Sequence, residues 1–301
     1  MDFKNIIGNE NAKEYLSKSI NQNNILHSYL FVGTDGIGKA LIAKEFSKKI
    51  LCLNKINNCT CKSCISFEGN NHPDFFIIND KESNIIKVED IRKLTEKVYE
   101  KPILSSNKIY IINDCDKLTI EAQNCLLKTL EEPPEFIVII LITSNENLLL
   151  NTIKSRCMTV KFNNIEDLQL LKYCKENLGY TSISNNLLKS FDGSIGKAIK
   201  IKNLKEKYER IDVMLSNIEK NSIIDLLHSK KFFEKENIED ELNYLIVCLY
   251  SKAKEDIRYL NCIKHVNNCL TRLRSNSNYD MTIDNLLINL WEEINENSNR
   301  C

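Results

Sequence analysis

The sequence lacks a long apolar run and has no excess of charge of either sign. Its longest strongly apolar run, Phe136 to Ile142, is far too short to span a bilayer, and the N-terminal residues contain no apolar core of a signal peptide. The chain carries 41 basic and 41 acidic residues, whereas a protein that binds DNA mainly by neutralising phosphates is normally basic. We therefore expect a cytoplasmic protein whose DNA contacts are local or shared with partners.

Cysteine is abundant in the chain, and it is unevenly spaced. The 301 residues, 43% of them hydrophobic, leave room for about two or three globular domains. The 12 cysteines are expected to be reduced in the cytoplasm unless a metal holds them. Four lie close together, at Cys52, Cys59, Cys61 and Cys64. Zn²⁺ takes four thiolates tetrahedrally, and ligands two to four residues apart on a tight turn reach it without strain. The cluster predicts a structural zinc site, with free thiols in a loop as the alternative.

The run from Gly33 to Ala40 is almost a phosphate-binding P-loop. An apolar run of strand length, Tyr29 to Val32, precedes it, and apolar residues at helical spacing follow from Lys39 to Leu51. In a P-loop the glycines let backbone N–H groups converge on the phosphates, the lysine reaches them, and a hydroxyl residue holds Mg²⁺. Alanine occupies the hydroxyl position here. We therefore predict no Mg²⁺ site, weak or absent ATP binding, and a residual phosphate cradle made by Gly33, Gly36, Gly38 and Lys39.

Strand and helix patterns alternate up to about residue 160, which predicts a parallel sheet flanked by helices. The expected strands after the P-loop are Asp74 to Ile78, Lys108 to Asn113 and Phe136 to Thr143. Thr119 is the expected N-cap of the helix before the last of these strands. Beyond Phe162 the pattern is almost wholly helical.

The strand from Lys108 to Asn113 bears on catalysis, because a P-loop ATPase places its second metal-binding carboxylate at the end of such a strand, often followed by a glutamate that polarises water. Asn113 takes the first position here and Asp114 the second. A shift of one residue would make Asp114 the metal ligand and Cys115 the water-polarising residue. Either alignment leaves the site defective.

In combination these motifs resemble the clamp-loader branch of the AAA+ ATPases, which serves bacterial DNA polymerase III. Besides the P-loop and the cysteine cluster, the resemblance rests on residues 71–74, the run Leu126 to Pro134, Ser155-Arg156-Cys157 and the run Thr271 to Asn276. It implies an α/β AAA+ P-loop module with a zinc-binding insertion over residues 1–162. A small helical lid over 163–205 and an all-α collar over 206–301 would follow.

The resemblance also assigns roles to two positions. Motor subunits of the family carry an arginine after Gly-Ser-x that contacts bound ATP, and Gly196 takes that place here. The Ser-Arg-Cys arginine of the family projects into the ATP site of the neighbouring motor subunit, so Arg156 is expected to act there in trans. The alternative is a surface arginine paired with a local carboxylate. With Ala40, Asn113 and Asp114, the loss at Gly196 predicts a subunit without catalysis of its own.

The expected partners follow from the same resemblance. They are motor subunits and a delta subunit in a hetero-oligomer, which would set the sliding clamp on primed DNA within the nucleoid-associated replisome. Two alternatives stay open. An active motor ATPase would have to bind Mg-ATP without a good metal ligand, and a zinc-dependent adaptor would bind protein or DNA without supporting a partner's ATP hydrolysis.

Overall fold

The computed structural model describes residues 3, 6–79, 85–202, 204–275 and 277–295, so Asn276, the last residue of the run from Thr271, lies outside the described residues. The chain forms two compact units. The first comprises Met1–Leu170 and Gly193–Gly196, and the second comprises Leu171–Asp192 and Lys197–Cys301. Among the described residues, no helix has the length and apolarity needed to span a membrane.

A five-stranded parallel sheet forms the centre of the first unit, as the sequence predicts. The strand order is β2-β3-β4-β1-β5, and every paired neighbour is parallel. The strands are β1 (Ser28–Val32), β2 (Phe75–Ile78), β3 (Lys108–Ile112), β4 (Ile137–Thr143) and β5 (Met158–Lys161). All their carboxyl ends therefore meet at one edge of the sheet, where α/β proteins place their ligand sites.

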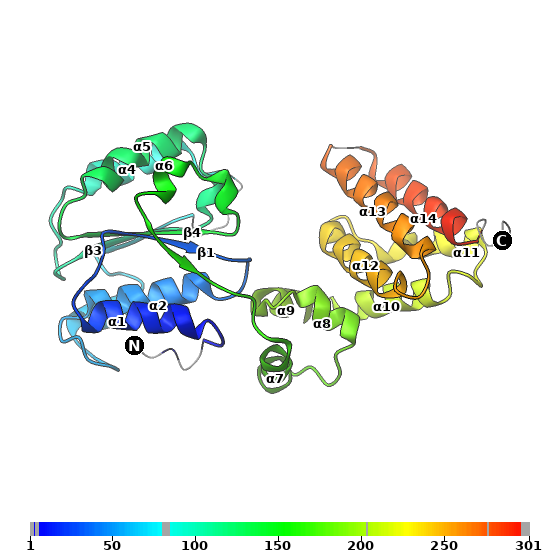
Figure 1. Cartoon of the computed structure of the whole chain (residues 1–301), viewed down its shortest axis with the longest axis horizontal. Coiled ribbons are helices and arrows are strands. Elements are labelled where there is room, and N and C mark those ends of the chain that lie inside the picture. The colour runs from blue at the N-terminus through cyan, green and yellow to red at the C-terminus, as the bar shows by residue number, and fades with distance from the viewer. Residues whose placement is uncertain (1–2, 4–5, 80–84, 203, 276, 296–301) are drawn as a thin grey trace. The chain divides into compact units, whose positions relative to one another are not determined.

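Helices cover both faces of this sheet (Figure 1). One face carries α1 (Glu10–Asn21) and α2 (Lys39–Leu51), and the other carries α4 (Val88–Lys97), α5 (Ile120–Glu131) and α6 (Asn151–Lys154). Because successive strand residues point to opposite faces, Phe31 and Leu30 of β1 belong to two different core clusters. The expected cap of α5 is confirmed, since the Thr119 hydroxyl accepts a hydrogen bond from the Ala122 N–H group at 3.3 Å.

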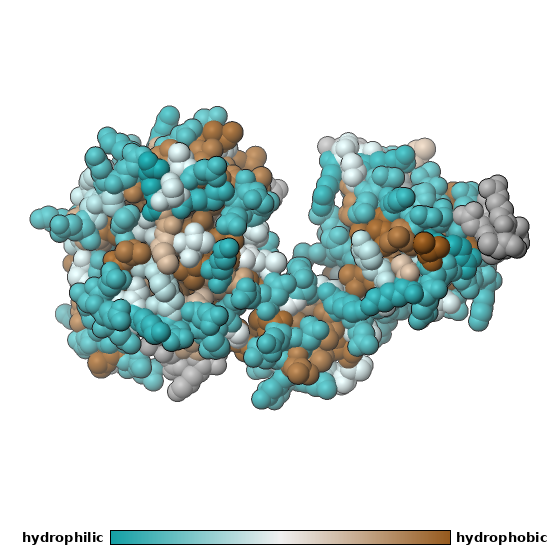
Figure 2. Space-filling view, in the orientation of Figure 1, coloured by the Kyte–Doolittle hydropathy of each residue, from teal (hydrophilic) through white to brown (hydrophobic). Residues whose placement is uncertain are grey.

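The described part of the second unit is helical. Its helices are α8 (Asn185–Phe191), α10 (Lys205–Ser216), α11 (Ile223–His228), α12 (Ile238–Lys252), α13 (Arg258–Arg274) and α14 (Tyr279–Asn295), while α7 (Asp167–Asn177) and α9 (Ile195–Lys202) have residues in both units. The rings of Tyr208 and Tyr244 stack in its core with centroids 4.3 Å apart. On the face shown in Figure 2, hydrophilic residues cover most of the surface and hydrophobic residues gather in smaller patches. An α/β AAA+ module followed by helical domains is the fold class that the sequence predicts.

Candidate functional site

The predicted phosphate cradle lies in the turn between β1 and α2. Gly38 has a φ of 97°, which favours glycine, and it is the residue that precedes the first turn of α2. Lys39 is 5% exposed, and its Nζ donates to the carbonyl oxygens of Gly33 and Thr34, the latter at 2.7 Å. Burial lowers the pKa of Lys39, although the carboxylates of Asp35, Asp114 and Asp116 act in the opposite direction. The lysine is therefore satisfied by its own loop.

The segment Gly193–Gly196 lies directly against this loop. The Gly196 N–H group donates to the Gly36 carbonyl at 2.9 Å, and the Ser194 hydroxyl donates to the Asp35 carbonyl at 2.7 Å. A Cβ atom added to Gly196 would meet the Gly36 Cα at 2.6 Å, a distance that requires the backbone to shift. The position where the resemblance expects an ATP-contacting arginine is thus occupied by a glycine in backbone contact with the P-loop.

The carboxyl edge of the sheet brings further polar groups near Lys39. Asp116, which follows β3, accepts hydrogen bonds through Oδ1 from the Thr143 hydroxyl at 2.5 Å and the Ser144 N–H group at 3.3 Å. Asp114 has a φ of 49°, and its Oδ2 lies 3.0 Å from the Lys117 Nζ. The sequence left the register of Asn113 and Asp114 open, and it did not single out Asp116. Both carboxylates are therefore engaged by their own neighbours.

Arg156 stands between α6 and β5, and its backbone is fixed from both sides. Its N–H group donates to the Ile153 carbonyl at 3.1 Å, and its carbonyl accepts from the Ser28 hydroxyl at 2.7 Å. The guanidinium lies 2.6 Å from Glu131 Oε1, and Nη1 donates to the Thr152 carbonyl at 2.8 Å. The arginine thus has the local carboxylate partner named as the alternative above, and Glu131 is a residue that sequence reasoning missed.

The four predicted metal ligands come together in the segment after α2. Cys52 follows the last residue of α2, Cys61 precedes α3 (Lys62–Glu68), and Cys64 lies in the first turn of α3. All four Sγ atoms lie within 4.8 Å of one another. A tetrahedral ion with metal–sulfur bonds of about 2.3 Å needs sulfurs roughly 3.8 Å apart, so the cluster is already near that size. The cysteines of this cluster could bind a metal ion.

The surroundings of the cluster favour a thiolate at Cys61, whereas burial raises the pKa of the Cys64 thiol, and the pKa of Cys59 is raised despite a hydrogen bond from the Cys61 N–H group. The N–H group of Cys61 and the side-chain amide of Asn54 each donate to Cys59 Sγ at 3.4 Å. Burial opposes ionisation of Cys61, but hydrogen bonds from the Cys64 and Leu53 N–H groups lower the pKa of this thiol to about 6. Donors of this kind orient thiolate ligands around a metal.

His72 ties the cysteine segment to the sheet. Its Nδ1 accepts from the Asp74 N–H group at 3.0 Å, so the neutral ring carries its proton on Nε2, which lies 2.9 Å from the Ser63 hydroxyl. Ser63 in turn donates to the Leu51 carbonyl at 2.7 Å. Burial lowers the pKa of His72, although the Asp74 carboxylate acts in the opposite direction.

We expect the stability of the chain to depend on pH through His72. The unfolded-state pKa is about 6.5 and the folded-state pKa is lower, so the stabilisation is fully present above about pH 6.5 and is lost progressively as the pH falls to the folded-state value. Denaturant unfolding of the wild type and of His72→Gln between pH 7.5 and 5.5 checks this. His72→Gln should lose less stability than the wild type over this pH range; equal losses in the two chains would refute the assignment.

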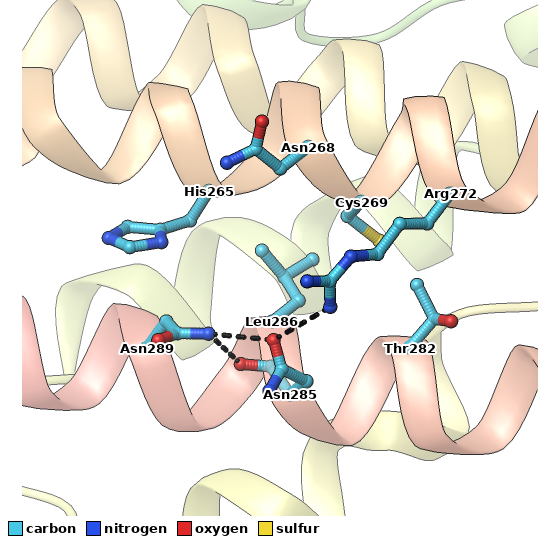
Figure 3. A pocket seen from close by; sticks show the side chains of 8 residues that line it. All are labelled: His265, Asn268, Cys269, Arg272, Thr282, Asn285, Leu286 and Asn289. Carbon is cyan, nitrogen blue, oxygen red and sulfur yellow. Dashed lines mark hydrogen bonds between the residues drawn. The ribbon is translucent and has the colours of Figure 1, made fainter.

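A pocket of about 300 Å³ lies in the second unit between α13 and α14 (Figure 3). Its polar side chains partly satisfy one another: the Asn289 amide donates to the backbone and side-chain oxygens of Asn285, and Arg272 Nη1 donates to Asn285 Oδ1 at 3.4 Å. None of the site residues predicted from the sequence lines this pocket.

Comparison with known proteins gives the following relationships. A model of the family described as DNA polymerase III, delta subunit, matches residues 8–166. The chain is 29% identical over 241 residues to DNA polymerase III subunit tau/gamma of Haemophilus influenzae, covering 75% of this chain and 35% of that protein. It is 38% identical over 149 residues to DNA polymerase III subunit delta' of Bacillus subtilis, covering 49% of this chain and 45% of that protein.

These alignments span only part of the relatives. The chain covers between 24% and 51% of the length of eight curated relatives that it matches. Among solved structures, a DNA polymerase III gamma subunit-related protein from Thermotoga maritima superposes with a TM-score of 0.53 at 20% identity, over 93% of this chain and 99% of that one. This last likeness concerns the fold alone.

Proposed function

The chain belongs to the DNA polymerase III, delta subunit family, and from this membership we propose that it is a clamp-loader subunit of the delta-prime type, acting in DNA replication. It would join motor subunits and a delta subunit in a complex that places the sliding clamp on primed DNA. The relatives named delta' and tau/gamma support a place in such a complex. The cytoplasm, at the nucleoid-associated replisome, is the proposed location.

A silent nucleotide site is the feature that favours delta-prime over a gamma/tau motor. The observation that carries this proposal is the hydrogen bond between Gly196 and Gly36, at the position where a motor would direct an arginine toward ATP. Ala40 offers no oxygen to Mg²⁺, and Asp116 is engaged by Thr143. The backbone of the P-loop is retained, and the proposed role of the P-loop is to hold the segment Gly193–Gly196 in place. Any remaining phosphate binding by Gly33, Gly36, Gly38 and Lys39 would be weak.

Arg156 is the residue proposed to act in catalysis, in trans. It would stabilise the charge that develops on the γ-phosphate in a neighbouring motor subunit, while this chain contributes a rigid wall. Its fixed backbone supports such a role, because only the side chain has to move to reach another subunit. We further propose that the ion held by Cys52, Cys59, Cys61 and Cys64 is zinc, since four thiolates select Zn²⁺ over harder cations. The proposed boundaries remain 1–162, 163–205 and 206–301.

The purified chain should not hydrolyse ATP on its own. We expect the same background rate for the wild type and for Lys39→Ala, because Ala40 has no oxygen with which to hold Mg²⁺. Steady-state phosphate release at saturating Mg-ATP measures this, with circular dichroism to confirm that both chains are folded. Hydrolysis above the Lys39→Ala background would instead identify an active motor.

Assembly provides the second half of the test. A loader reconstituted from the motor and delta subunits should need this chain for clamp- and DNA-stimulated ATP hydrolysis. If the chain joins the complex but leaves that hydrolysis unchanged, the adaptor alternative is favoured.

A further inference from the structure

We propose that Glu131 is a positioning residue for Arg156: its carboxylate holds the guanidinium against its own chain, and Arg156 reaches a neighbour's triphosphate only after leaving Glu131. This inference rests on the proposed function, because it assumes that Arg156 acts in trans. Glu131 is the last residue of α5, and its effect on hydrolysis is expected to operate entirely through Arg156.

The contacts of the guanidinium give the first argument. A guanidinium has five N–H donors. Here Nη2 lies 2.6 Å from Glu131 Oε1, while Nη1 donates to the Thr152 carbonyl at 2.8 Å and to the Ser155 hydroxyl at 3.4 Å. Both terminal nitrogens, which an arginine uses for a forked grip on a phosphate, are therefore committed to acceptors of the same chain.

The direction of the side chain gives the second argument. Thr152 precedes Arg156 by four residues, so the arginine folds back along α6, and Glu131 holds its other terminal nitrogen from α5. The Arg156 side chain is only 33% exposed in this arrangement. Reaching into another subunit requires it to extend, which breaks the contacts to Thr152 and Glu131.

Charge explains why the contact with Glu131 is reversible. Glu131 is the ion-pair partner of Arg156, and its side chain is 47% exposed, so water screens the pair and keeps it weak. A triphosphate carries more negative charge than one carboxylate and accepts the same donors, so it displaces Glu131 once a neighbour presents it. Glu131 thus keeps Arg156 oriented and paired while the neighbouring site is empty.

The size of the effect follows from a competition between two positions of Arg156. A half-exposed pair favours the held position by a factor of about two to five, which corresponds to about 0.4–1 kcal/mol at 1.4 kcal/mol per tenfold. The apparent affinity of the neighbouring site for its substrate is multiplied by the fraction of Arg156 side chains that are not held by Glu131. Since the pair multiplies the held population by this factor, removing the carboxylate charge should raise kcat/KM for ATP by up to about two- to fivefold.

The test is a double-mutant cycle in the reconstituted loader with clamp and primed DNA. We expect Glu131→Gln to raise kcat/KM for ATP by up to about two- to fivefold, and to have no effect when combined with Arg156→Ala. Glu132→Gln is the matched control, because Glu132 is the adjacent exposed carboxylate and makes no ion pair with any residue that the structure describes. It should behave like the wild type.

Each other outcome has a defined meaning. Unchanged or reduced hydrolysis with Glu131→Gln, or the same gain in the Arg156→Ala background, would overturn the role of Glu131. If Arg156→Ala itself leaves hydrolysis unchanged, it is the proposed function that fails. Thermal unfolding of each variant confirms that folding is intact, since an exposed pair of this kind contributes little to stability.

Discussion

Arg156→Ala is expected to lower ATP hydrolysis at the motor site that Arg156 faces by about 10³-fold or more in the assembled loader, since arginine fingers in related reactions contribute about 10³–10⁵. The total rate of ATP hydrolysis should fall by the fraction that this site contributes, and by more if hydrolysis at the different sites is coupled. The reason is electrostatic: no other group of this chain is proposed to reach the γ-phosphate. Clamp- and DNA-stimulated phosphate release, measured on loaders of equal composition, gives the result.

Two control variants distinguish a specific role of the Arg156 guanidinium from a general effect of removing a surface charge. Arg156→Lys keeps the positive charge but loses the planar fork, so it should recover only a small part of the activity. Lys161→Ala removes an exposed cation from β5 and should leave hydrolysis at the wild-type rate. Full activity in Arg156→Ala loaders would reduce Arg156 to a surface residue and leave scaffolding as the function of the chain.

The parts of the fold that the sequence predicts are those with strong local signals. The strand predicted over Tyr29 to Val32, the glycine turn and the helix from Lys39 are each specified by a run of neighbouring residues, and the structure confirms all three, with the strand beginning one residue earlier, at Ser28. The helix α3, by contrast, has only seven residues and contains the last cysteine of the cluster, Cys64. The strand β5 has four residues, of which only Val160 is buried, so neither element has enough residues to show a period.

Candidate site residues can be named from the sequence, and their roles are proposals, but the contacts among them cannot be predicted from it. The motif around Arg156 identifies the arginine, yet its partner Glu131 is 25 positions earlier and is brought close only by the packing of α5 and α6. The hydrogen bond between Asp116 and Thr143 likewise joins the turn that follows β3 to the last residue of β4. Contacts of this kind depend on sheet order and register, which local patterns do not encode.

The proximity of the four cysteines was predictable because they lie close together in the sequence, and removing the proposed zinc ion should have the second large effect. We expect Cys64→Ser, or chelation of the wild type, to lower the Tm of the unfolding transition by about 10 °C. This corresponds to several kcal/mol at about 2–4 °C per kcal/mol for a unit of this size. Structural zinc sites contribute about 10–16 kcal/mol in isolated peptides, and the segment here has other anchors, so a smaller loss is expected.

Those anchors are the bonds from Ser63 and Ser105 to the Leu51 carbonyl, which keep the end of α2 in place without the metal. Chelation should therefore loosen the segment from Cys52 to Cys64 and leave the sheet folded.

Elemental analysis should find about one zinc ion per chain. The control variant Cys125→Ser, which replaces a half-buried cysteine of α5, should keep both the zinc and the Tm. A chelator should shift the Tm of the wild type but not that of Cys64→Ser, because only the wild type has a metal to lose. A wild type that contains no zinc after metal-replete purification would instead make the four thiols a reduced cluster whose proximity has another cause.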